Sequence, residues 1–156
     1  MTILLVRHAR AGRRDRWVGD DRLRPLSKKG RVQAEDLSAK LRELAGAQRL
    51  TLRSSPWVRC VQTLEPLASA LGTEIKSDDA LGEGMGAKAV EVLGFWIRQG
   101  PAALCTHGDV IEAILTHLTG SGVRLGGRLQ AAKGSVWVLG VTDGAIVSAR
   151  YVPPPA

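Results

Sequence analysis

The stretch Thr2-Ile3-Leu4-Leu5-Val6-Arg7-His8 begins with a short apolar run and ends abruptly in an arginine and a histidine. An apolar run of this length, rich in branched side chains, is typical of a buried strand. In an open α/β sheet, ligands bind in the crevice beyond the carboxyl ends of the strands. An arginine fork matches phosphate oxygens two at a time, and an imidazole can act as a nucleophile, acid or base. Arg7 and His8 are therefore candidates for an anion site, although two solvated polar residues at a strand end would leave the same pattern.

Strands and helices alternate along the rest of the sequence. Helices are predicted from Ser27 to about Ala45, from Ser54-Ser55-Pro56 to Gly72, after the Gly-rich loop 81–86, and from His107 onward. Strands are predicted at 48–53, 73–76 and 102–106, with a hairpin over 135–152 that turns at Thr142-Asp143-Gly144. This alternation predicts a three-layer α/β/α sandwich whose mostly parallel central sheet ends in a C-terminal antiparallel hairpin. Residues 10–26 and 120–133 are expected to be irregular. We expect one domain over 1–152 and a Pro-rich tail over 153–156.

The composition is that of an ordinary globular domain with one core. The chain has 156 residues, of which 44% are hydrophobic, and no apolar stretch approaches the roughly 20 residues that span a bilayer. The first apolar run is too short for a secretory signal, so we expect a cytoplasmic protein. Cys60 and Cys105 both lie in apolar contexts, which predicts buried, reduced thiols.

The positive charge is concentrated at the start of the chain. Residues 1–31 hold ten Lys and Arg against three Asp, an excess that equals the net charge of +7 of the whole sequence. A localised basic segment indicates an anionic partner or substrate. Only 4% of the residues are aromatic and they are scattered, so no stacking platform for nucleic acid is visible. A phosphorylated substrate is the better interpretation, and a plain soluble basic surface is the alternative.

Further chemical groups fall where other strands should end. Arg59 lies in the first turn of the helix after Ser54-Ser55-Pro56, Glu83 lies in the Gly-rich loop, and His107 and Gly108 follow the strand 102–106. If the sheet is doubly wound, these groups converge with Arg7 and His8 on one crevice. Each has a simpler explanation by itself, such as a helix cap or a solvated side chain. Together they predict a site for a phosphate dianion.

This set of residue types suits phosphoryl transfer, which depends mainly on positioning and charge stabilisation. Arg7, Arg59 and a protonated His107 would stabilise the equatorial oxygens, aided by backbone N–H groups at Gly108. An unprotonated His8 could attack phosphorus in line. The leaving oxygen then needs a proton. Glu83 is the best-placed donor; Asp20 and Asp21 are weaker candidates, and Asp109 is expected to cap its helix.

A set of motifs in fixed order carries a family resemblance. They are Leu5-Val6-Arg7-His8-Ala9, Arg24-Pro25-Leu26 through Gly30 and Gln33-Ala34, Ser54-Ser55-Pro56 with Arg59, Gln62-Thr63 and Thr106-His107-Gly108. Together they resemble the histidine phosphatase superfamily, and within it the short SixA-type phosphohistidine phosphatases. The resemblance implies a hydrolase without cofactor or metal, with His8 as the phosphorylated nucleophile and Arg7, Arg59 and His107 in the phosphate pocket. It also suggests Glu83 as proton donor, in a region that varies between branches.

Two departures from the commonest family pattern bear on the substrate. Ala9 stands where most members have glycine, as in the SixA-like branch, and the chain is too short for the insertions that cover the site in phosphoglycerate mutases. An open site favours water as acceptor and therefore hydrolysis. Residues 17–26 also look similar to domains fused behind Nudix hydrolases in actinobacterial proteins. The main expectation is a SixA-like phosphohistidine phosphatase, and the alternative is a nucleotide or diphosphate phosphohydrolase.

Rival functions have weaker support in the sequence. His8, His107 and His117 have no spacing typical of a metal site, and His117 is expected to be a surface or packing residue. Cys105 is disfavoured as a nucleophile because it should point into the packed sheet. A non-catalytic phosphoryl-binding module remains the alternative outside enzymes.

Overall fold

Seven strands form one mixed sheet in the order β3-β2-β4-β1-β6-β7-β5. A computed structural model describes residues 1–155; Ala156, the last residue of the predicted tail, lies outside them. The strands are β1 (Thr2–Arg7), β2 (Thr51–Ser54), β3 (Ile75–Ser77), β4 (Ala102–Thr106), β5 (Leu125–Gly126), β6 (Val136–Thr142) and β7 (Ala145–Val152). Strands β1 to β4 run parallel to one another, whereas β6 pairs antiparallel with both β1 and β7. The predicted parallel sheet with a C-terminal antiparallel hairpin is confirmed.

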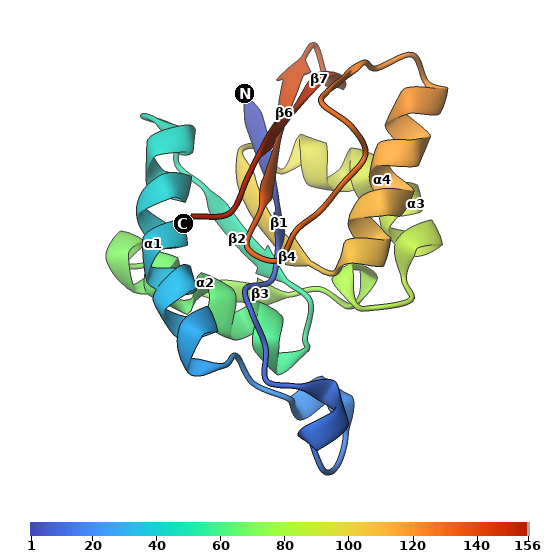
Figure 1. Ribbon diagram of the computed structural model, residues 1–156. Helices are drawn as coiled ribbons and strands as arrows, with labels where there is room; N and C mark the ends of the chain where they lie inside the picture. The colour runs from blue at the N-terminus through green and yellow to red at the C-terminus, as the bar shows by residue number, and fades with distance from the viewer. Residues whose placement is uncertain (156) are drawn as a thin grey trace.

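Two helices cover each face of the sheet (Figure 1). They are α1 (Lys28–Ala45) and α2 (Val58–Leu71) on one face, and α3 (Gly86–Arg98) and α4 (Gly108–Gly120) on the other. Three short 3₁₀ turns complete the structure: η1 (Arg14–Arg16), η2 (Asp21–Leu23) and η3 (Asp79–Leu81). The three layers predicted from the alternation of elements are therefore present.

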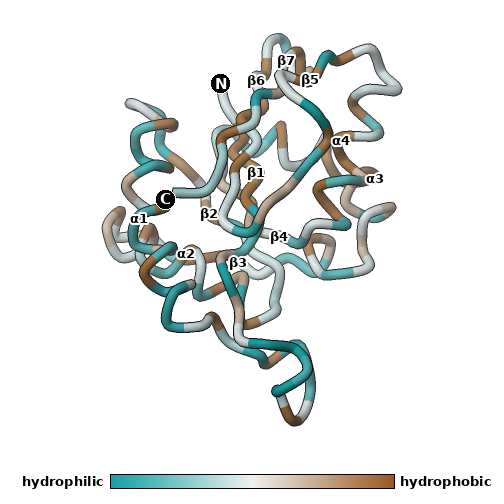
Figure 2. Tube along the Cα trace, in the orientation of Figure 1, coloured by the Kyte–Doolittle hydropathy of each residue, from teal (hydrophilic) through white to brown (hydrophobic). Residues whose placement is uncertain are grey.

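Strand β1 lies in the middle of the sheet and is buried on both faces. Ile3 and Leu5 pack with the cluster under α3 and α4, whereas Leu4 and Val6 pack with the cluster under α1 and α2. Side chains alternate between the faces of a strand, so a strand covered on both sides needs an apolar residue at every position. Figure 2 shows this hydrophobic centre around β1.

The predicted helix boundaries are confirmed at α1 and shifted at α2. The Ser27 hydroxyl accepts a hydrogen bond from the Gly30 amide, as expected of a cap. Helix α2, however, begins at Val58 rather than at Ser54-Ser55-Pro56. The Ser55 amide still donates to the Cys105 carbonyl at 2.9 Å, so the chain stays extended beside β4 for one more residue.

Two further predictions need correction. Asp109 does not cap α4, because His107 holds the N-cap position and the Asp109 carboxylate accepts from the Gly84 amide at 2.8 Å instead. The segment 120–133 is not wholly irregular, since β5 pairs with β7. That strand is only two residues long, so its own sequence gives no periodic signal.

Residues 10–26 form a polar lobe that extends below the carboxyl ends of the parallel strands (Figures 1 and 2). An isolated bridge joins Ala11 to Leu26 at the neck of this lobe. The neck lies against α1 at Gly30, where a Cβ would stand 1.8 Å from the Arg10 carbonyl oxygen, so only glycine fits. The lobe therefore has a fixed position over the strand ends.

No helix within residues 1–155 has the length and apolar character that a membrane crossing requires. Cys60 and Cys105 are both buried and free, as predicted. Both ends of the described chain contribute to the same sheet, through β1 and β7; the single domain over 1–152 stays a prediction.

Candidate active site

The ends of three neighbouring parallel strands bring the predicted residues together. Strand β4 lies between β1 and β2, and its Thr106 is in register with Arg7 while its Cys105 is in register with Ser54. The residues that follow these strands therefore meet at one edge of the sheet. They line a cleft of about 560 Å³. The predicted residues on its wall are Arg7, His8, Arg59, Glu83, His107 and Gly108, and the lobe adds Ala11, Gly12, Arg13, Arg14 and Arg24.

His8 is held as a neutral imidazole with one nitrogen free. Its Nδ1 lies 2.8 Å from the carbonyl oxygen of Ala9, which can only accept, so Nδ1 carries the proton and Nε2 keeps its lone pair. The Ala9 amide in turn donates to the Thr63 hydroxyl at 2.9 Å. Burial, and to a smaller extent nearby positive charge, lowers the pKa of His8 to about 3. His8 is therefore unprotonated at neutral pH, as a nucleophile must be.

His107 is fixed from behind and presents its other nitrogen to the cleft. Its Nε2 lies 2.9 Å from the Ser55 hydroxyl, and its ring packs edge to face on Trp57 with centroids 4.9 Å apart. Its Nδ1 is buried and has no hydrogen-bond partner within residues 1–155. A buried nitrogen without a partner is costly unless a ligand satisfies it. The contact of Ser55 with His107 is not predicted from the sequence, in which Ser55 indicates only the start of a helix.

Arg7 and Arg59 supply the positive charge. The Arg7 Nη1 donates to the Ala131 carbonyl at 2.6 Å, and a Cβ on Gly108 would stand 3.1 Å from the Arg7 Cζ. Arg59 is almost fully buried and stacks over Trp57, with its Cζ 4.7 Å from the ring centroid. The Nε of each guanidinium is buried without a partner in the described part of the chain. Burial lowers the pKa of both groups, yet an arginine stays charged in a protein.

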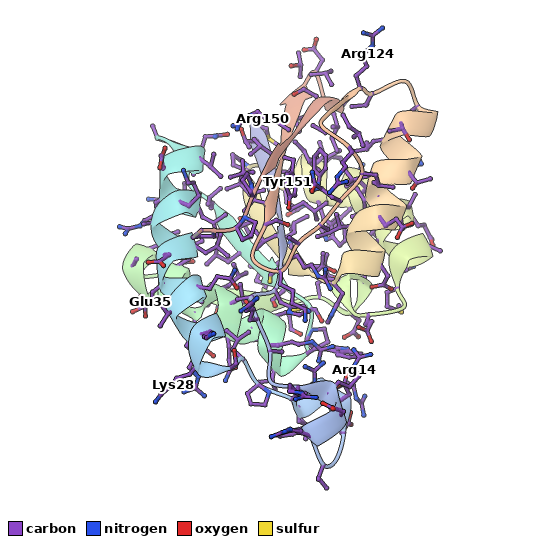
Figure 3. The ribbon with its side chains drawn as sticks, viewed as in Figure 1. Arg14, Lys28, Glu35, Arg124, Arg150 and Tyr151 are labelled. Carbon is purple, nitrogen blue, oxygen red and sulfur yellow. The ribbon has the colours of Figure 1, made fainter. Side chains whose placement is uncertain are left out.

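Glu83 is the predicted acid that reaches into the cleft among these cations. Its Oε1 lies 3.5 Å from Arg59 Nη2, 3.6 Å from Arg14 Nη2 and 3.9 Å from His107 Nδ1. One carboxylate oxygen thus lies within 4.0 Å of three donor groups that line the cleft. Figure 3 shows Arg14 on the lobe.

The other acid candidates form closer pairs with arginines than Glu83 does. The Asp20 carboxylate bonds to Arg22 at 2.7 Å, on the exposed side of the lobe. The Asp21 carboxylate accepts from Arg24 Nε at 2.7 Å and lies 3.3 Å from Arg59 Nη2. The hydrogen bond from Arg24 and the nearby guanidinium groups lower the pKa of Asp21, which makes it a poor acid. Asp21 also contacts Arg59 through its backbone carbonyl at 2.9 Å; its spacing of three from Arg24 could have suggested the pair with Arg24, whereas nothing in the local sequence indicates the contact with Arg59.

The rival candidates of the sequence lie away from the cleft. His117 is exposed on α4, and Cys105 packs in the core under α1 and α2. Within residues 1–155, no group of three or more His, Cys, Asp or Glu side chains is arranged to hold a metal ion. Lys133 also lines the cleft and was missed, because an isolated lysine in an irregular segment gives no sequence signal.

Comparison with known proteins gives the same family as the motifs. The sequence profile of the histidine phosphatase superfamily (branch 1) matches residues 3–91. The 8-oxo-(d)GTP phosphatase of Mycolicibacterium smegmatis is 40% identical over 162 aligned residues, which cover 99% of this chain and 48% of that protein. The chain therefore spans about half the length of this curated relative.

Solved structures show the same fold at low sequence identity. The protein histidine phosphatase SixA complexed with tungstate superposes with a TM-score of 0.73 at 16% identity, over 97% of this chain and 94% of that chain. The putative phosphohistidine phosphatase SixA from Nakamurella multipartitia superposes with a TM-score of 0.69 at 22% identity, over 99% of this chain and 96% of that chain. Sequence profile and fold agree: the chain belongs to branch 1 of the histidine phosphatase superfamily.

Proposed function

We propose that the chain is a phosphohydrolase that acts on nucleoside di- or triphosphates through a covalent phosphohistidine on His8, without a metal ion. The observation that carries the proposal is the pairing of His8 with Ala9. This contact leaves the Nε2 lone pair free inside a cleft where Arg7, Arg59 and His107 have unpartnered donors. A neutral nucleophile facing preorganised positive charge is the arrangement that phosphoryl transfer requires.

The first half of the reaction transfers the phosphoryl group to the protein. His8 Nε2 forms a bond to phosphorus while the bond from phosphorus to the leaving oxygen breaks, and the electron pair departs on that oxygen. Arg7, Arg59 and His107 Nδ1–H hold the three equatorial oxygens, with the amide at Gly108 as a further donor. Glu83 in its acid form gives a proton to the leaving oxygen.

The second half returns the protein to its starting state. Water attacks phosphorus, the N–P bond breaks, and the electron pair returns to His8 Nε2. The Glu83 carboxylate takes the proton of the attacking water, so that the net reaction consumes one water and releases phosphate. Glu83 serves in both steps because its carboxylate lies at the mouth of the cleft, with its side chain 37% exposed.

A nucleotide substrate is better supported than the phosphohistidine protein that the SixA resemblance favours. The relative named an 8-oxo-(d)GTP phosphatase is 40% identical over nearly the whole chain, whereas the SixA structures are 16% and 22% identical. The cleft also has room beyond one phosphate, and the lobe arginines Arg13, Arg14 and Arg24 lie on its wall. A polyanionic substrate suits that wall.

The test is a substrate panel with the wild-type protein and His8→Ala. The panel holds 8-oxo-dGTP, 8-oxo-dGDP, dGTP, dGDP, a phosphohistidine protein and p-nitrophenyl phosphate. We expect His8-dependent turnover with the highest kcat/KM on a nucleotide. A preference for the phosphohistidine protein would return the assignment to a SixA-like activity. Equal background rates from both proteins on every substrate would instead indicate a non-catalytic phosphoryl-binding module.

A further inference from the structure

A second cavity adjoins the cleft on the side of α1. It has a volume of about 620 Å³ and lies between the start of α1, the segment before β6 and the last described residues. Its lining residues are Arg10, Lys29, Val32, Gln33, Asp36, Ala132, Lys133, Pro154 and Pro155. Lys133 lines both this cavity and the cleft that contains His8. The two spaces therefore meet at one cation.

The backbone at Lys133 is tied directly to the strand that carries the nucleophile. The Gly134 amide donates to the carbonyl oxygens of Arg7 and His8, both at 3.1 Å. The Gln33 side chain donates to the Lys133 carbonyl at 3.1 Å and accepts from the Arg10 amide at 3.0 Å. Gln33 thus fixes Arg10 and Lys133 relative to each other. Both cations are held by backbone contacts, and neither side chain forms a hydrogen bond or an ion pair with another residue in the part of the chain that the structure describes.

The positive charge at this junction is only partly balanced, since Asp36 is the single carboxylate on the wall of the second cavity within residues 1–155. Neither Arg10 nor Lys133 has a carboxylate within 4.0 Å in the described residues, whereas Arg13, Arg14 and Arg24 are each paired with one. Burial and then the four neighbouring guanidinium groups, which belong to Arg7, Arg24, Arg10 and Arg14, lower the pKa of Lys133. An excess of positive over negative side chains at one place indicates a site for an anion.

The cavity on the opposite side of Arg7 has the wrong charge for an anion. It measures about 440 Å³, lies along α4, and has the acidic residues Asp109 and Glu112 on a wall that is otherwise largely apolar. A phosphate leaving the cleft on that side would approach two carboxylates. The cavity on the side of Lys133 carries the three cations Arg10, Lys29 and Lys133 against one carboxylate, that of Asp36, so electrostatics favours that side.

We propose that Lys133, together with Arg10, binds the second, non-transferred phosphate of a diphosphate ester while the terminal phosphate lies at His8. The proposal rests on the phosphohydrolase function proposed above and names the feature of the substrate that the site selects. The leaving group then extends into the cavity between α1 and the segment before β6. Lys133 is a specificity-determining residue in this arrangement, and it contributes little to the binding of a monophosphate.

The direct test measures binding by calorimetry and needs no turnover. Methylenediphosphonate, whose C–P bonds resist transfer, is compared with inorganic phosphate on the wild type, Lys133→Met and Lys133→Arg. We expect the wild type to bind the diphosphonate more tightly than phosphate. Lys133→Met should lose roughly tenfold in diphosphonate affinity and less than twofold for phosphate, because one charge-assisted hydrogen bond is lost. Lys133→Arg should keep most of the preference.

Lys28→Met is the matched control. It removes the same charge at the position next to Lys29, which lines the second cavity. Lys28 is exposed at the start of α1 and lines neither space (Figure 3). We expect its affinity for both probes to stay within twofold of the wild type. An equal loss of affinity for both probes in Lys133→Met, or no loss of affinity for either probe, would overturn the inference.

Kinetics separate this inference from the proposed function. If Lys133→Met lowers kcat/KM for nucleoside diphosphates but not for p-nitrophenyl phosphate, the proposed function and the phosphate subsite at Lys133 are both supported. If it affects the two substrates alike while His8-dependent nucleotide hydrolysis persists, the proposed function stands and the subsite is wrong. If the diphosphonate preference depends on Lys133 but no nucleotide is hydrolysed, the subsite stands as a diphosphate site and the nucleotide assignment is wrong.

Discussion

The imidazole rings of His8 and His107 meet edge to face, with their centroids 5.4 Å apart and 65° between their planes. Each ring is held by a different contact: His8 by the Ala9 carbonyl, His107 by the Ser55 hydroxyl. Two similar side chains thereby receive different tasks. One has a free lone pair and the other an unpartnered nitrogen that can donate to a phosphate.

Replacement of His8 by alanine should abolish turnover. The variant loses the only group proposed to form the N–P bond, so kcat should fall by about 10³-fold or more. His117→Ala is the control, because His117 is exposed on α4 and should keep full activity. Rapid quench with labelled substrate should trap an acid-labile, alkali-stable phosphoramidate on the wild type alone. Label on serine or on Cys105 would contradict the assignment.

The burial of His8 should make the protein less stable in mild acid. The unfolded chain binds a proton at His8 below about pH 6.5, whereas the folded protein does so only near its pKa of about 3. The unfolded state therefore binds more protons between these values, and the free energy of unfolding falls as the pH is lowered through this window. The contribution reaches about 2 kcal/mol between pH 6.5 and pH 5.

Urea titrations of the wild type, His8→Asn and His117→Asn at pH 7 and pH 5 measure this effect. His8→Asn should lose less stability between the two pH values than the wild type, because the buried titrating group is gone. His117→Asn should behave like the wild type. An identical pH dependence in all three proteins would mean that His8 titrates normally in the folded state.

Asp21 should act on catalysis through Arg59 rather than as an acid. Its carbonyl and carboxylate both contact the Arg59 guanidinium, at 2.9 and 3.3 Å. Asp21→Asn should raise KM for phosphate esters by roughly three- to tenfold while kcat changes less, because one charge-assisted contact that positions Arg59 is weakened. Asp15→Asn is the control, since Asp15 pairs with Arg13 in solvent. A large loss of kcat with unchanged KM would point to proton transfer by Asp21.

Gly108 should be required for the position of Arg7. A Cβ at Gly108 would stand 3.1 Å from the Arg7 Cζ, so the guanidinium would have to shift by a few tenths of an ångström. Gly108→Ala should lower kcat/KM by about tenfold, since small misplacements of charge are costly in a preorganised site. Gly120→Ala, at the other end of α4, meets no atom within 4 Å and should leave kcat/KM unchanged. Similar kinetics in both variants would show that Arg7 tolerates the shift.

Hydrolysis should persist in EDTA. The proposed charge stabilisation comes from Arg7, Arg59 and His107, which need no metal ion. Initial rates on p-nitrophenyl phosphate before and after dialysis against EDTA should agree within experimental scatter. Complete loss of activity that a divalent ion restores would show that the mechanism is metal-dependent.

The sequence alone determined the layers of the fold and the main members of the site. Apolar runs of four residues directly before Arg7-His8 and Thr106-His107 predict parallel strands that are buried on both faces, because this pattern is local in the sequence. The carboxyl-end rule then places the polar residues at one edge. The helix from Ser27 to Ala45 and the hairpin turn at Asp143-Gly144 are equally local and were predicted with small errors.

Only the tertiary structure decided how these residues divide the chemistry. The proton on His8 Nδ1 follows from a contact with Ala9, and the free nitrogen of His107 from a contact with Ser55, which directly follows β2. Asp21 differs from Glu83 by the hydrogen bond that it accepts from Arg24, since Arg14 and Arg59 lie beside both carboxylates. The meeting of Lys133 with Arg10 depends on Gln33 of α1. These are contacts between residues far apart in the chain. Local spacing encodes secondary structure, whereas hydrogen-bond partners and charge neighbours exist only after the layers have packed.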